Sequence, residues 1–235
     1  MIWTEREHDS RHYHLKRPVT GRSRLIGVCR WLLVAILLQG GSLSAESVPV
    51  RYPEGTIHGF LALRTLEGKL LAGGDLTEVI HGNQVVSHLV FRFKDGSVDD
   101  ETTVFSQHGT FRLISDHHIQ KGPSFPHPTN VLINAATGQV TVRYQDKDHE
   151  KVETDHLNLP PDLANGILVS LIKNISPNTE ETKVSFVGAA PKPRLVQLSI
   201  APHGEETFSV ASTRHKATVF TIKVEIGGIA GILRR

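Results

Sequence analysis

The densest group of side chains that could do chemistry is Asp116-His117-His118, with His127 nine residues further on. Histidine and aspartate are both accepted as ligands by zinc. In a β-strand, however, alternate side chains point to opposite faces, so Asp116 and His118 would lie on one face and His117 on the other. His127 falls in a proline-rich stretch, so three ligands would converge only through a bend. We therefore favour solvated or hydrogen-bonded histidines, with a metal site at His117, His118 and His127 as the alternative.

Other patterns give little reason to expect catalysis. The run Asp99-Asp100-Glu101 offers calcium ligands, but adjacent acids beside a hairpin turn are more typical of a solvated face. Ser106 and Ser124 lack the GxSxG context of a hydrolase nucleophile, and there is no phosphate-binding or dinucleotide-binding motif. The sequence therefore predicts no catalytic residue and no cofactor.

The single cysteine and the charge balance exclude further classes of site and function. Cys29 lies in the N-terminal segment, so a chain that loses residues 1–45 has no disulfide and no thiolate metal site. Removing the seven basic and three acidic residues of that segment from totals of 26 and 24 leaves 19 and 21, a net charge of −2. A near-neutral domain with scattered charges lacks the basic patch of a nucleic-acid-binding protein.

The N-terminal segment has the layout of a secretory signal peptide. A basic region is followed by the apolar run Trp31–Leu38 and then by small residues up to Ala45. A membrane span needs about 20 apolar residues, and Arg30 and Gln39 bracket only eight. We predict cleavage after Ala45, or after Ser44 as second choice, and an exported periplasmic or extracellular protein without a stable membrane span. The alternative is an inner-membrane anchor at residues 31–38.

The remainder, residues 46–235, reads as one domain built mainly of β-strands. Val85, Leu89, Phe91 and Phe93 alternate with polar side chains, and Asp95-Gly96 is a strong hairpin signal. Strands are predicted at Thr56–Leu66, Lys69–Ile80, Gln84–Lys94, Val98–Gln107, Thr110–Lys121, Val131–Asn134, Gln139–Tyr144, Glu150–Leu157, Lys183–Ala189, Arg194–Ala201, Glu206–Ser212 and Ala217–Ile226. With no recurring crossover helix, this pattern favours a single antiparallel meander or half-barrel sheet with one helix packed on one face.

The stretch Leu159–Ile175 supplies that helix. Its apolar residues recur with helical period over about 14 residues, after Pro160-Pro161 and before Ser176-Pro177. The stripe consists of Leu163, Ala164, Ile167, Leu168, Leu171, Ile172 and Ile175. Gly166 inside it costs about 1 kcal/mol relative to alanine, which indicates close approach to another backbone.

A helix of this length covers about 21 Å, less than a long sheet exposes. We therefore predict an apolar groove or cavity beside the helix, lined by Phe91, Phe93, Phe111, Ile167 and Leu171. The C-terminal segment Gly227–Leu233 is apolar as well. It either docks against the domain or marks the chain as a truncated relative of a longer one.

Three segments carry a resemblance: DLTEVIHG, VFRFKDGSVDDETTVFSQHGTFRLISDHHIQKGPSFPHP and LNLPPDLANGI. Over about Asp75–Ile175 the chain resembles a family of exported bacterial β-rich proteins of the domain-of-unknown-function type. More loosely, the layout is similar to periplasmic lipoprotein carriers, whose curved sheet wraps helices around an apolar cavity. The first resemblance implies no catalytic residue.

Together these observations favour a non-catalytic envelope module that binds an apolar small molecule, a lipid or another envelope protein. The alternative is a metal-dependent envelope enzyme that uses Asp116, His117, His118 and His127.

Overall fold

The computed structural model describes residues 47–146, 149–189, 192–210 and 212–225. All of them belong to one compact unit. The signal peptide predicted at residues 1–45 and the apolar segment Gly227–Leu233 lie outside the described residues, so both stay predictions. Among the described residues, no helix has the length and apolar character to cross a membrane.

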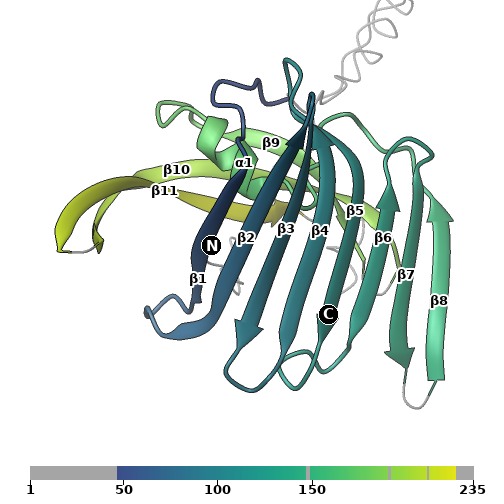
Figure 1. Ribbon diagram of the computed structural model, residues 1–235. Helices are drawn as coiled ribbons and strands as arrows, with labels where there is room; N and C mark the ends of the chain where they lie inside the picture. Colours follow the sequence, from purple (N-terminus) through teal and green to yellow (C-terminus); the bar gives the residue numbers. More distant parts are fainter. Residues whose placement is uncertain (1–46, 147–148, 190–191, 211, 226–235) are drawn as a thin grey trace, which may run out of the picture. The chain divides into compact units, whose positions relative to one another are not determined.

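The first eight strands form one antiparallel sheet in which each strand pairs with the next along the chain (Figure 1). They are β1 (Ile57–Arg64), β2 (Leu70–His81), β3 (Gln84–Phe93), β4 (Val98–Ser106), β5 (Arg112–Lys121), β6 (Thr129–Asn134), β7 (Gln139–Asp146) and β8 (His149–His156). The sheet stays open, because β1 and β8 are its two ends and do not pair with each other. The predicted mainly β fold with an antiparallel meander is confirmed.

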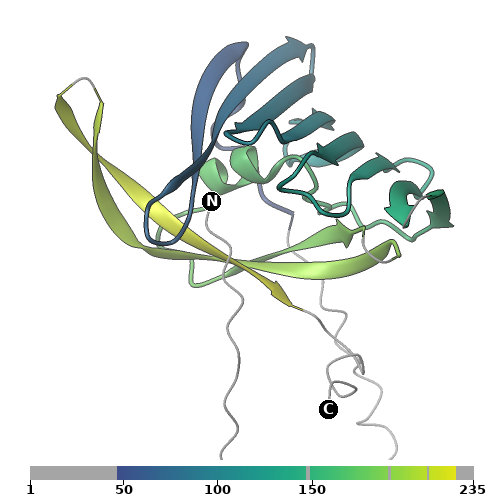
Figure 2. The ribbon, with the colours of Figure 1, turned by 90° about the horizontal axis from the view of Figure 1, so that it is seen from below.

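The last three strands form a second, smaller antiparallel sheet in the order β11-β10-β9. These strands are β9 (Thr182–Gly188), β10 (Arg194–Val210) and β11 (Thr213–Glu225). β10 joins two strands that the sequence predicted separately, because an irregularity between Pro202 and Glu205 lets the pairing with β11 continue. Since β9 covers only Arg194–Ile200 of β10, the far ends of β10 and β11 pair with each other alone and project as an arm (Figure 2).

The helix α1 (Leu168–Asn174), the one α-helix in the described part of the chain, is half as long as predicted. Gly166 interrupts the helical pattern, since its φ of +67° is a left-handed conformation that an α-helix does not contain. The apolar residues before it form turns instead, and Pro160-Pro161 lie well ahead of the helix start. The prediction of a helix from about Asp162 was therefore wrong, although the apolar stripe is buried as expected.

Residues 160–167, which we call the strap, connect the two sheets. The Asp162 carboxylate accepts a hydrogen bond from the Ser185 N–H at 2.8 Å. The Asn165 amide both accepts from the Val187 N–H at 2.8 Å and donates to the Val187 carbonyl at 3.1 Å. The strap thus pairs with the edge of β9 that β10 leaves open, and it supplies the partners that those buried backbone groups need.

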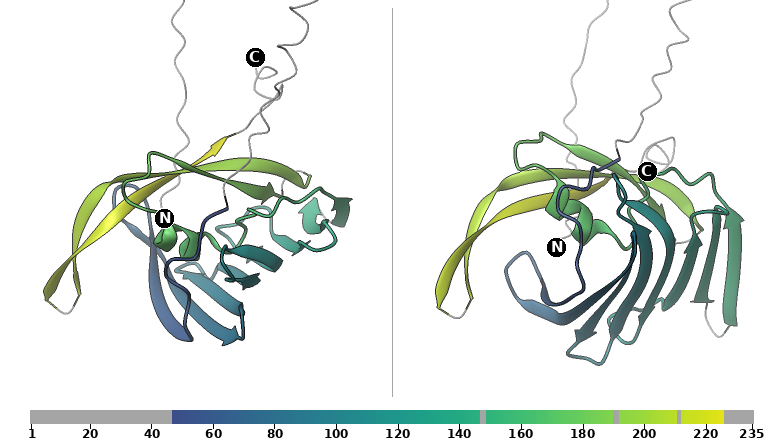
Figure 3. Two further views of the ribbon diagram at one scale, coloured as in Figure 1. Left: turned by 90° about the horizontal axis from the view of Figure 1, so that it is seen from above. Right: turned by 45° about the horizontal axis from the view of Figure 1, so that its top comes forward.

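The core lies between the inner face of the large sheet and the small sheet, with α1 between them (Figure 3). Phe105 and Phe111, whose rings lie 6.0 Å apart, are fully buried at its centre. Leu198 and Ile200 of β10 close it from the other side.

The N-terminal lead-in is tied to α1 by Asn174, whose side chain is 1% exposed. Its Oδ1 accepts hydrogen bonds from the N–H groups of Arg51 and Tyr52, both at 2.7 Å. Its Nδ2 donates to the carbonyls of Tyr52 and Ser170. The amide therefore meets its full hydrogen-bonding capacity inside the protein.

Candidate functional site

The inner face of β4 and β5 carries a cluster of ionisable side chains below the strap. The register of these two strands sets Glu101 opposite His118, Asp99 opposite Gln120 and Thr103 opposite Asp116. We refer to Asp99, Glu101, Asp116 and His118 as the inner cluster. Its four side chains range from part-buried to fully buried, so they interact outside bulk water.

His118 links the carboxylates of this cluster. Its Nε2 lies 2.8 Å from Asp99 Oδ1, and its Nδ1 lies 4.0 Å from Glu101 Oε1. Gln120 donates to the second oxygen of Asp99 at 2.9 Å. Asp116, which is 2% exposed, accepts a hydrogen bond from the Thr103 hydroxyl at 2.8 Å.

The surroundings raise the pKa of three members of the inner cluster. Burial and then the charge of Asp116 raise the pKa of Glu101 to about 8. Burial raises the pKa of Asp116 to about 6, against the Thr103 hydrogen bond. Burial opposes the charged form of His118, but the Asp99 hydrogen bond and the nearby carboxylates outweigh it and raise the pKa of His118 to about 9.

The pKa of Asp99 moves the other way. Burial would raise it, but the hydrogen bond and the charge of His118, with the Gln120 amide, outweigh burial and hold this pKa below its usual range. At neutral pH the cluster therefore contains a protonated imidazole beside an ionised Asp99, while Glu101 keeps its proton.

The predicted zinc ligands are separated by the fold. His117 points to the outer face of the sheet, where its Nε2 lies 3.0 Å from Asn130 Oδ1, while His118 joins the inner cluster. His127 is exposed in the loop between β5 and β6. Among the described residues, no group of three or more His, Cys, Asp or Glu side chains is placed to hold a metal ion.

Sequence reasoning missed that Asp99 and Glu101 would meet His118. The turn of the β4–β5 hairpin near His108-Gly109 indicates which residues face each other, but without an irregularity that pairing would set Glu101 opposite His117. The irregularity between Val104 and Phe105 shifts that register by one residue, and the shift puts Glu101 opposite His118.

A second ionisable group joins the lead-in to α1. Lys173 Nζ donates to Glu54 Oε2 at 2.7 Å, and Glu54 is 6% exposed. Burial and then the charge of Glu54 raise the pKa of Glu78 to about 7. Glu78 Oε2 is buried, and no described residue forms a hydrogen bond to it. A neutral, protonated Glu78 carries the lower desolvation cost at this position.

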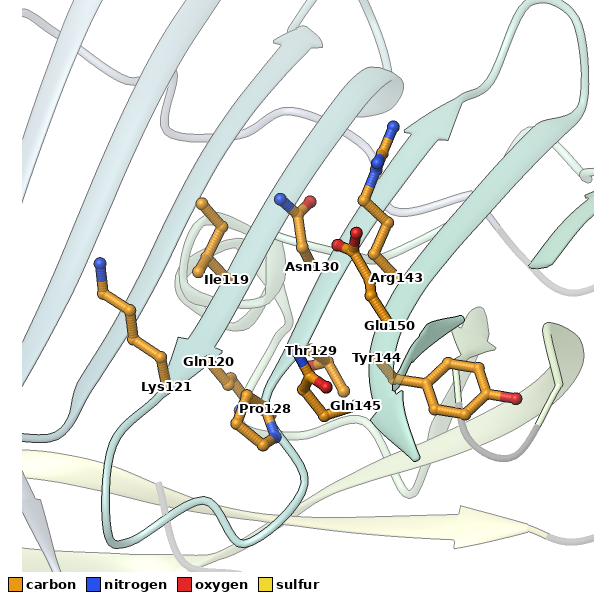
Figure 4. A pocket seen from close by; sticks show the side chains of 10 residues that line it. All are labelled: Ile119, Gln120, Lys121, Pro128, Thr129, Asn130, Arg143, Tyr144, Gln145 and Glu150. Atoms are coloured by element: carbon orange, nitrogen blue, oxygen red, sulfur yellow. The ribbon is translucent and has the colours of Figure 1, made fainter. Parts of the chain in front are cut away.

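The hollows on the surface of the described residues include two that bear on ligand binding. One, of about 190 Å³, lies at the ends of β5–β8 (Figure 4). Ile119, Asn130 and Arg143 form a cross-strand row in it, on the outer face. Its other lining residues are Gln120, Lys121, Pro128, Thr129, Tyr144, Gln145 and Glu150.

The other hollow, of about 440 Å³, lies between the end of α1, the lead-in and β11, and we call it the helix-side pocket. It is lined by Arg51, Tyr52, Ile172, Lys173, Asn174, Ile175, Ser176, Pro177, Thr218 and Phe220. Ile172 and Phe220 are half-buried, and Tyr52 is 61% exposed. The pocket thus combines apolar walls with the cationic side chains of Arg51 and Lys173.

The five residues that we expected to line an apolar groove do not lie together. Phe111, Ile167 and Leu171 are buried in the core. Phe91 packs against Gly74, and Phe93 makes an edge contact with Phe125 at 5.3 Å between ring centres. The hollow beside α1 instead uses Ile172 and Ile175.

Comparisons with protein-family models, with curated proteins and with solved structures gave no match for this chain.

Proposed function

We propose that this protein binds an amphipathic anion, such as a fatty acid, in the helix-side pocket. The observation that carries the proposal is the composition of that pocket. Tyr52, Ile172 and Phe220 offer an apolar wall, and Arg51 lines the same hollow. A volume of about 440 Å³ falls within the usual range for a small-molecule site, about 300–1,000 Å³.

The charges around the pocket favour an anion. Lys173 is compensated by Glu54 at 2.7 Å, whereas the described residues supply no ionic partner for Arg51. A guanidinium forms paired hydrogen bonds to a carboxylate or phosphate. The partial negative charge at the end of α1 acts against an anion, so the proposed attraction depends on Arg51.

A carrier or storage role in the cell envelope fits this site and the export signal that the sequence predicts. The proposal includes no catalytic step. The inner cluster lies on the large sheet and does not line the pocket, and the described residues that line the pocket include no nucleophile with an adjacent base. The metal-dependent alternative has no comparable support among the described residues.

Fluorescence titration of the purified protein with a dansyl-labelled fatty acid, followed by displacement with palmitate, tests the proposal. We expect saturable binding that Arg51→Gln weakens by at least about tenfold, with Arg112→Gln, an exposed arginine on β5, as the matched control. Ile172→Trp should fill the pocket and abolish binding, whereas Val169→Trp, on the exposed side of the same helix, should not. Equal binding by all four variants would refute the assignment.

A further inference from the structure

The two ends of the large sheet differ in chemistry. β8, at one end, has the sequence HEKVETDH, with three acids, a lysine and two histidines among its eight residues. β1, at the other end, has the sequence IHGFLALR, with a single charged residue at its last position. Among the described residues, only β2 pairs with β1 and only β7 pairs with β8, so each of these two strands has one edge at which no described strand is added.

Charged side chains on an edge strand prevent further strands from adding to it. β8 is protected in this way and β1 is not. The outer face of β1 also presents Phe60, which is 80% exposed, more than any other large apolar side chain described. An apolar, nearly uncharged edge is a site at which another strand adds.

We propose that two copies of this chain pair through β1, antiparallel and across a twofold axis, so that their large sheets become continuous. This inference does not depend on the helix-side pocket. A second copy is the partner that the charges allow, since the one charged residue of the strand, Arg64, lies at its end, and an antiparallel pair puts the two copies of Arg64 at opposite ends.

The side chains select one register. In an antiparallel pair, directly opposed side chains lie on the same face of the sheet. With the twofold axis perpendicular to the sheet, one residue must therefore lie directly opposite its own copy. An axis at Leu61 would place Phe60 opposite Ala62, so the two Phe60 rings would not face each other. An axis at Phe60 places the two Phe60 rings side by side, a favourable cross-strand pair.

Gly59 gives independent support for the axis at Phe60. In strands a glycine weakens pairing, and it often marks a place where another group approaches closely. Within its own chain this position does not require glycine. Its φ is not in the left-handed range, and an added β-carbon would make only an ordinary contact with Leu76 at 3.9 Å. In the proposed register Gly59 lies opposite Leu61 of the second copy, which would occupy the free space.

The interface is small. Eight residues a side bury less than the roughly 1,600 Å² of a typical stable complex. We therefore expect a reversible dimer whose population rises with protein concentration.

Sedimentation velocity over a concentration series, on protein purified from cells that express the full-length gene, tests the dimer. We expect a concentration-dependent dimer that Phe60→Lys weakens by at least about tenfold with an unchanged melting temperature. Val152→Lys, at an apolar position on β8 that is 50% exposed, is the matched control and should leave the dimer intact.

Cysteine cross-linking tests the register. In a Cys29→Ser background, Phe60→Cys should form a disulfide-linked dimer on mild oxidation, because the axis brings the two copies of residue 60 together. Val152→Cys should stay monomeric. The proposal is overturned if the protein is monomeric at every concentration or cross-links equally through both positions. It is overturned as well if the protein is monomeric and an extended segment of another protein binds to β1.

Discussion

Gly166 of the strap lies directly over the Asp116 carboxylate of β5. A β-carbon at residue 166 would stand 2.7 Å from Asp116 Oδ1 and would overlap the Thr103 hydroxyl. The strap can therefore reach the inner face of the large sheet only because residue 166 has no side chain. Its φ of +67° adds a second reason for glycine.

We expect Gly166→Ala to lower the free energy of unfolding by about 2–4 kcal/mol, from the overlap and the left-handed backbone together. Urea denaturation measures this change. Gly73→Ala is the control, because a β-carbon there meets no atom within 4 Å and its φ is not left-handed. Similar losses in the two variants would contradict the close approach.

Stability should decrease as the pH rises from about 5 to about 9. Folding raises the pKa of Glu101 from 4.5 to about 8 and that of His118 from 6.5 to about 9. A group whose pKa is higher in the folded protein stabilises the fold fully when the pH is below its pKa in the unfolded chain. This stabilisation is lost as the pH rises through its pKa in the folded protein. Asp99 has a lowered pKa, so its contribution to stability is lost as the pH falls, and only at acid pH.

Melting temperatures across this pH range measure the effect. In Glu101→Gln the fall between pH 6 and pH 9 should be smaller, because one of the groups that titrate has been removed. Glu206→Gln, an exposed carboxylate on β10, should keep the slope of the unchanged protein. A melting temperature that rises with pH would show that the inner cluster is more solvated than its geometry indicates.

His118→Ala should destabilise the protein by about 2–3 kcal/mol, since it leaves Asp99 and Glu101 together without their cationic partner. His127→Ala should change stability by less than about 0.5 kcal/mol, because His127 is exposed in a loop. Chemical denaturation at pH 6 compares the two. Equal effects would argue against the separate placement of these histidines.

Asn165→Ala should cost about 2–4 kcal/mol, because it leaves the buried N–H and carbonyl of Val187 without partners. Hydrogen exchange should show faster exchange of the Val187 amide in this variant. Asn178→Ala, on an exposed turn, serves as control. Unchanged protection at Val187 would mean that β9 does not depend on the strap.

Several elements were readable from the sequence for local reasons. The alternation in β3 and the turn at Asp95-Gly96 specify a hairpin without help from the rest of the chain. Gly96, with a φ of +87°, and the bond from the Ser97 N–H to Asp95 Oδ1 at 2.9 Å account for that turn.

Other elements depended on distant partners. The apolar residues before Leu168 have helical spacing, but Asp162 and Asn165 bond to β9, about 20 residues further on, and this pairing replaces a helical turn. The division of the strands into two sheets likewise depends on the strap, and spacing alone does not reveal it.

The inner cluster was half predicted. Alternation correctly placed Asp116 and His118 on one face and His117 on the other. Asp99 and Glu101 on β4 could be placed beside His118 only once the register of β4 and β5 was known, and one irregular residue changes that register. The helix-side pocket shares none of the five residues predicted to line a groove, because Phe111, Ile167 and Leu171 are buried in the core instead.

The order of strands in the large sheet has a consequence for folding kinetics. Each of its strands pairs with its neighbour in sequence, so the sheet can grow one hairpin at a time, and each step closes only a short loop. β9 and the strap are further apart in the sequence than the two strands of a hairpin. Their pairing adds little stability until Gly166 packs against Asp116. We infer that the eight-stranded sheet forms early, and that docking of the three-stranded sheet is the slower, later event.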